Sequence, residues 1–197
     1  MTKLVLGLLI FLGIHAMRVW GPNLRSHLIA SWGPWRFKAL YSVLSLWGLW
    51  WLVTGYAEAK LVPDELWSPP FFLRHIALLL MWLAMVLLVA AYVPGNGIRA
   101  ILRHPMTLAV KVWALAHLLS NAHTADVLLF GAMLVWAILV YRNARRVDRS
   151  NMVGMLRSST PLLNLGTLLS VLLGSGLWFW LTLGGGHLAL IGVSPMG

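Results

Sequence analysis

The chain of 197 residues contains no cysteine. Without thiols it cannot form disulfide bonds, cysteine nucleophiles, zinc sites with cysteine ligands or iron–sulfur clusters. Acidic residues are scarce as well, with five Asp and Glu in total. They supply no paired carboxylates and no apparent Ser-His-Asp arrangement, so hydrolase chemistry is not expected.

Charge of either sign is rare, because only 10% of the residues are charged while 60% are hydrophobic. A soluble domain carries about 25% charged residues, so this chain is predicted to be an integral membrane protein. The twelve tryptophans agree, since tryptophan is enriched at the lipid–water interface. In a soluble protein the formal charge of +10 would suggest nucleic acid as a partner. In a membrane protein basic loops fix topology and meet anionic lipid, so membrane lipids are expected as partners and nucleic acid is not.

Six stretches are apolar over the length of about 20 residues that a membrane-spanning helix needs. They are Lys3–Trp20, Lys38–Ala57, Phe71–Val93, Pro105–Asn121, Ala125–Tyr141 and Pro161–Leu183. No internal repeat or linker divides the chain, so residues 1–197 are predicted to form a single transmembrane domain. The expected fold class is an all-α integral membrane protein, a six-helix transmembrane bundle.

Basic residues gather in the first, third and fifth loops between these stretches, which share one face if there are six spans. They are Arg18, Arg25, Arg36, Lys38, Arg99, Arg103, Arg142, Arg145, Arg146, Arg149 and Arg157. Three of the five acidic residues, Glu58, Asp64 and Glu65, fall on the opposite face. By the positive-inside rule the basic loops are cytoplasmic and both termini lie outside.

Histidines within the apolar stretches are the main candidates for a functional site, because ionisable groups are costly in a bilayer and mark function. Four of them lie inside or at the ends of predicted spans: His15, His75, His104 and His117. The other three, His27, His123 and His187, fall in loops or in the tail and are expected to be solvated.

His104 and His117 belong to one predicted helix and are 13 residues apart. This separation is about 20 Å along the helix axis, so the two imidazoles cannot share a metal ion. At the inner end Arg103, His104 and Lys111 form a corner that attracts anions, together with the positive end of the helix dipole.

His117 shares its helical face with Trp113 and Asn121. A neutral imidazole at this depth is a potential metal ligand, and Asn121 can orient it. An interhelical hydrogen bond is the alternative role for a lone membrane histidine. Several intramembrane histidines, many tryptophans, no cysteine and few acids favour haem, whose iron takes one or two imidazoles and whose propionates need cations. Zinc is less favoured because carboxylates and thiols are missing, and copper lacks a matching Met or His spacing.

Three stretches, "FLGIHAMR", "LRHIALLL" and "LRHPMTLAVKVWALAHLLSN", resemble the NnrU family of bacterial inner-membrane proteins. The likeness runs through most of the chain up to about Arg149, and the third stretch is its most specific part. The NnrU family is in turn similar to 15-cis-ζ-carotene isomerase, an integral membrane enzyme that uses haem b. The resemblance implies a multi-pass protein of the bacterial inner membrane with haem b as its suspected cofactor.

In the isomerase the histidines that match His15 and His117 ligate the haem, which implies bis-His ligation of iron by these two residues here. A histidine matching His75 and the Arg-His-Pro at 103–105 are also shared. One position departs from the isomerase, which has a cysteine associated with ligand switching where this chain has Ala114. Because of this difference we still expect haem binding, but isomerase activity is expected less.

The depths of the candidate ligands leave a second pairing open. The span boundaries put His15 in the inner leaflet and His117 nearer the outer one, whereas two axial ligands of one iron must lie at nearly equal depth. His75 and His117 are each about four residues from an outer helix end. His15 is therefore the first partner of His117 by resemblance, and His75 is the second by depth.

The expected function is that of a bis-His haem-b protein of the NnrU type. Redox, sensing or cis-trans isomerase-like chemistry fits it, with a small hydrophobic substrate or a redox partner protein and a link to denitrification. One alternative is a membrane methyltransferase that uses S-adenosylmethionine, since isoprenylcysteine and phospholipid methyltransferases also open a helix with Arg-His-Pro. The acidic residue that such enzymes carry downstream would be Asp148 here. The other alternative is a non-enzymatic accessory or assembly protein of a respiratory complex.

Overall fold

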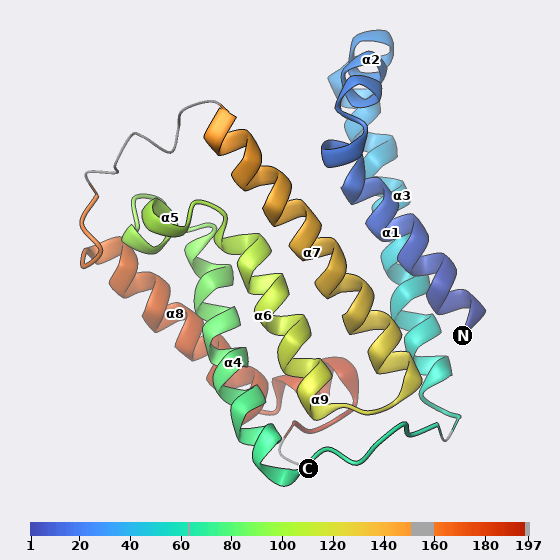
Figure 1. The fold of residues 1–197 in the computed structure, drawn as a ribbon, viewed down its shortest axis with the longest axis vertical. Helices are drawn as coiled ribbons and strands as arrows, with labels where there is room; N and C mark the ends of the chain where they lie inside the picture. Colours follow the sequence, from blue (N-terminus) through green and yellow to red (C-terminus); the bar gives the residue numbers. More distant parts are fainter. Residues whose placement is uncertain (63, 151–159, 196–197) are drawn as a thin grey trace.

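The computed structural model describes residues 1–62, 64–150 and 160–195, and it is helical throughout apart from its loops and one isolated bridge between Glu65 and His123. In chain order the helices are α1 (Thr2–Trp20), α2 (Pro22–Trp32), α3 (Pro34–Ala59), α4 (Phe71–Ala90), α5 (Gly97–Leu102), α6 (Pro105–Ser120), α7 (Thr124–Ser150), α8 (Leu165–Thr182) and α9 (Gly186–Ile191). Figure 1 shows their arrangement.

The six long helices occupy the six stretches predicted from the sequence, and local chemistry sets several of their ends. Pro22, Pro34 and Pro105 each stand in the first turn of a helix, where proline's missing N–H has no intrahelical partner to lose. Helix α8 begins later than predicted because the Asn164 side chain caps it by accepting a hydrogen bond from the Thr167 amide. The short helices α2, α5 and α9 were not predicted, because they fall in segments that the sequence indicated as loops and tail.

Only part of the predicted membrane topology is confirmed. Helices α4, α7 and α8 are long and apolar enough to cross a membrane, while α6 is apolar but shorter. The segment Thr2–Met17 passes the same test together with α2, from which it is bent by 83°. A membrane protein is therefore supported, whereas six spans and outside termini stay predictions.

The long helices form an open row. Contacts link them in the order α3, α1, α7, α6, α4, α8, and in the described part of the chain α8 does not return to α3 to close a bundle. Helix α2, helix α5 and the last turns of α7 lie at the upper ends of the long helices in Figure 1, so the basic segments gather on one side of the protein, across the row. The α3–α4 connection, the α6–α7 turn and α9 lie at the lower end.

Two helix pairs approach closely at glycines. A side chain at Gly7 of α1 would overlap the backbone of Leu52 in α3, and one at Gly174 of α8 would lie 2.6 Å from the Cα of Val86 in α4. A Cβ at Gly13, by contrast, would meet nothing within 4 Å. Small residues at helix interfaces let backbones pack tightly in a membrane, so Gly7 and Gly174 set the spacing of their helix pairs.

We expect Gly7→Ala to lower the unfolding midpoint of the purified protein, because the new methyl group forces α1 away from α3. Gly13→Ala in the same helix is the matched control. The methyl group added at position 13 meets open space, and the better helix propensity of alanine stabilises the protein by up to about 1 kcal/mol. Thermal unfolding in detergent, followed by circular dichroism, measures both variants. Equal midpoints for the two would contradict the close α1–α3 packing.

Candidate functional site

His117 lies on α6 among aromatic side chains. Its ring stacks on Phe130 of α7 with centroids 4.3 Å apart and planes at 7°, and the Trp113 ring lies edge-on at 5.2 Å. The Asn121 amide nitrogen is 3.3 Å from His117 Nδ1. Trp113, His117 and Asn121 thus lie together at the end of α6, as their spacing predicts, and the orienting role of Asn121 stays a prediction.

His187 of α9 lies next to His117. The two imidazole centroids are 6.4 Å apart and their planes differ by 29°. His187 Nδ1 donates to the carbonyl oxygen of Val193 at 2.6 Å, which leaves Nε2 with its lone pair. His187 lies in the tail and is half-exposed, and α9 brings it beside His117, a contact that the sequence did not predict.

His15 lies on α1 beside a different set of rings. Its imidazole is 4.3 Å from the ring of Phe11, 5.6 Å from that of Tyr41 on α3 and 6.3 Å from that of Trp136 on α7. His15 Nδ1 donates to the carbonyl oxygen of Phe11 at 2.7 Å, so its Nε2 also keeps a lone pair. The Trp136 indole nitrogen is buried, and no described residue forms a hydrogen bond with it.

The structure does not bring His15 and His117 together. Their α7 neighbours, Trp136 and Phe130, are six residues apart, which is a rise of about 9 Å along that helix. His15 therefore lies deeper towards the inner end than His117, as the span boundaries predicted. A depth difference of this size is too large for both residues to ligate one iron unless the helices shift. Their pairing stays a prediction.

His75, the second predicted partner, is exposed on α4, and its ring packs against Phe71 of the same helix at 5.0 Å. No group of three or more His, Asp or Glu able to hold a metal ion occurs among the described residues. A haem does not need such a group, because its iron takes at most two ligands from the protein.

The predicted cationic corner at the start of α6 is formed, with an acid at its centre. Asp148 of α7 lies 3.1 Å from His104 Nε2 and 3.6 Å from the Arg103 guanidinium, and Arg145 approaches it at 3.8 Å. Lys111 places its ammonium 4.6 Å from the centre of the Tyr141 ring. Arg103, His104 and Lys111 therefore face α7, where one carboxylate neutralises part of their charge.

The α6–α7 turn holds a second polar cluster that the sequence did not indicate. Asp126 is fully buried and accepts hydrogen bonds from the Tyr56 hydroxyl at 2.5 Å, from Lys60 Nζ at 3.0 Å and from the His123 amide at 3.0 Å. The His123 side chain is buried too, and its Nε2 donates to the carbonyl oxygen of Val62 at 2.6 Å. The expectation of a solvated His123 is wrong, because the segment after α3 folds over this turn.

The residues that the sequence missed share one property, which is that their partners lie far away in the chain. His187 is 70 residues from His117, and Asp126 is 66 residues from Lys60. The only signal available for them was residue type, namely a histidine and an acid in a chain poor in acids.

The family model described as "NnrU protein" matches residues 3–195. No curated protein and no solved structure matches the chain.

Proposed function

This chain belongs to the NnrU family, and from that premise and the surroundings of His117 we propose that it binds haem b in the membrane with His117 as an axial ligand. The proposal includes the bacterial inner membrane as its location and a role connected with denitrification. Bound haem would supply redox and small-ligand chemistry at this position.

The observation that carries the proposal is the spacing of the two imidazoles at His117 and His187. A metal–imidazole bond is about 2 Å long, so two imidazoles on neighbouring helices could both hold one haem iron if their nitrogens turned towards it. The centroids of His117 and His187 are 6.4 Å apart. The aromatic rings of Phe130 and Trp113 beside His117 suit a flat apolar macrocycle.

The tautomers of the histidines support the same proposal. His187 donates through Nδ1 to a carbonyl oxygen, the arrangement that leaves Nε2 ready to ligate a metal. At His117 the Asn121 amide nitrogen donates to the His117 carbonyl oxygen and lies 3.3 Å from Nδ1, so ligation through Nε2 would require the imidazole proton to move away from Nε2. His15 also donates through Nδ1 and leaves Nε2 free to ligate. Two residues are therefore candidates for the second iron ligand: His15 because of the family resemblance and His187 because it lies near His117.

The test is the visible absorption and EPR spectra of the detergent-purified protein, produced in cells well supplied with haem. We expect a Soret band and the low-spin signal of an iron with two imidazole ligands. A protein that lacks a Soret band after haem-replete expression, and takes up none on titration with haem b, would overturn the proposal.

Isomerase activity of the carotene isomerase type is not part of this proposal. Ala114, which stands where that enzyme has a cysteine, is completely buried in the core with Leu129 and Phe130. Its methyl group offers iron no ligand in exchange for an imidazole. Redox or sensing chemistry, or an accessory role beside a respiratory complex, fits the residues better.

The methyltransferase alternative has one supporting contact, the approach of Asp148 to His104. That carboxylate is already engaged by Arg103 and Arg145. S-adenosylmethionine carries a sulfonium cation, so a surrounding rich in arginine repels the reactive part of the cofactor. Binding of S-adenosylmethionine by the purified protein, measured by calorimetry, would favour this alternative over the haem proposal.

A further inference from the structure

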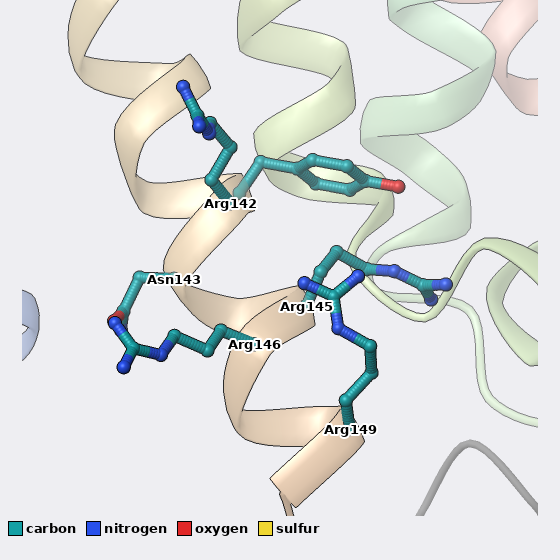
Figure 2. A pocket seen from close by; sticks show the side chains of 6 residues that line it. Arg142, Asn143, Arg145, Arg146 and Arg149 are labelled. Carbon is teal, nitrogen blue, oxygen red and sulfur yellow. The ribbon is translucent and has the colours of Figure 1, made fainter.

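The last turns of α7 form an open cleft lined mainly by arginine. Its volume is about 570 Å³, and it is lined by Tyr141, Arg142, Asn143, Arg145, Arg146 and Arg149. Figure 2 shows the four labelled arginines and Asn143 along this helix; Arg149 turns back towards the side chain of Arg145, whereas Arg142 and Arg146 extend to the other side.

The positive charge of this cleft is largely uncompensated. Of the five acidic residues in the chain, only Asp148 lies at this end, and residues 151–159 contribute none. Asp148 is shared by Arg103, His104 and Arg145. In the described part of the chain no carboxylate pairs with Arg142, Arg146 or Arg149.

The spacing of the four arginines follows one face of the helix. Positions 142, 145, 146 and 149 are related by steps of three and four residues, which places their side chains next to one another. Like charges at these steps destabilise a helix by about 0.2–0.5 kcal/mol per pair. A negatively charged ligand in the cleft would turn this repulsion into attraction.

The position of the cleft relative to the membrane indicates which negatively charged ligand would bind there. The apolar part of α7 runs from Ala125 to Tyr141, about 25 Å at helical rise, which approaches the thickness of the hydrocarbon core of a bilayer. Arg142 follows immediately, so the arginine face begins where the phospholipid headgroups begin.

From these observations we infer that the cleft is a binding site for the phosphate headgroup of an anionic phospholipid. Guanidinium groups donate in a fork that matches phosphate oxygens, and the Asn143 amide and Tyr141 hydroxyl add neutral donors at the rim. The positive-inside rule alone requires only that cations be present in the loop. Here four arginines of one helix line a single cleft, and no carboxylate is among the residues that line it.

The experiment compares Arg142→Gln/Arg146→Gln with Arg25→Gln/Arg36→Gln in the full-length detergent-purified protein. The two double variants remove the same charge from the same end of the helix row, and all four residues are exposed. Native mass spectrometry measures bound phosphatidylglycerol against bound phosphatidylcholine. We expect the wild type and the Arg25/Arg36 variant to retain phosphatidylglycerol, and the Arg142/Arg146 variant to bind it about tenfold more weakly.

Three results would overturn the inference. The first is equal binding of the two lipids by the wild type, and the second is an equal loss in both double variants, which would mean a diffuse charge effect. The third is inorganic phosphate displacing the lipid at similar concentration, which would assign the cleft to a free anion. If the Arg142/Arg146 variant does not fold, Arg142→Lys/Arg146→Lys preserves charge while removing the guanidinium fork, and unchanged lipid affinity would then contradict a phosphate-specific site.

Discussion

Replacement of His117 by alanine is expected to abolish the low-spin haem spectrum of the purified protein. His117 is the proposed ligand of the haem iron, and its imidazole lies between the ring of Phe130 and the neighbouring His187. Its loss removes one iron bond and leaves an apolar gap in the helix row. Absorption spectroscopy of the variant, at matched protein concentration and haem supply, measures the effect.

The companion variants His187→Ala and His15→Ala identify the second ligand. If His187 holds the second axial position, its loss converts the low-spin spectrum into that of a five-coordinate high-spin iron, whereas His15→Ala leaves the spectrum unchanged. The opposite pattern would assign the position to His15 and require α1 and α6 to shift by several ångströms relative to each other. His27→Ala, which removes an exposed histidine from α2, is the control for losses unrelated to ligation.

These spectra separate two kinds of failure. A wild type without a Soret band contradicts haem binding as a whole. A wild type with haem, together with a His117→Ala variant that keeps the low-spin spectrum, contradicts only the assignment of His117. The arginine cleft at the C-terminal end of α7 is tested by lipid binding, and its test does not depend on either spectrum.

The positions of the long helices could be predicted from the sequence because their signals are local. Apolar runs of the right length indicate where α3, α4, α6 and α8 lie, although the run for α3 begins at Lys38 and the helix itself at Pro34. The order of the helices in the row could not be predicted, because it depends on which faces pack together. Gly7 and Gly174 mark close approaches, yet Gly13 looks the same in the sequence and faces open space.

The candidate site divides in the same way. The stripe of Trp113, His117 and Asn121 follows from helical periodicity, and so does the separation of His117 from His104. The approach of His187 depends on the turn of the chain between α8 and α9, and no periodicity in α6 contains that information. Asp148 was noticed only as a downstream acid, whereas the structure places it at the start of α6 as a partner of Arg103 and His104.

Asp126→Asn is expected to be the most destabilising single substitution at the lower end of the helix row. The Asp126 carboxylate is fully buried and receives the Tyr56 hydroxyl, the Lys60 ammonium and the His123 amide. Asparagine keeps one acceptor oxygen but turns an NH₂ donor towards a group that also donates. The Lys60 side chain is 36% exposed, so the cost is that of the lost hydrogen bonds to a buried carboxylate, about 1.5–3 kcal/mol. We therefore expect a drop in the unfolding midpoint of several degrees in detergent.

Glu58→Gln provides the matched comparison, since it also removes one carboxylate from an ion pair at this end of the protein. Glu58 lies 2.6 Å from Lys3, with side chains that are 58% and 31% exposed. Exposed pairs of this kind are worth about 0–1 kcal/mol, so the unfolding midpoint of Glu58→Gln should stay close to that of the wild type.

The double variant Asp126→Asn/Lys60→Met adds a second check. If the cost of Asp126→Asn comes from an unpaired ammonium, removing that ammonium recovers part of the lost stability, and a double variant less stable than Asp126→Asn would contradict this explanation. Equal midpoints for Asp126→Asn and Glu58→Gln would mean that the Asp126 cluster does not fasten α3 to α7.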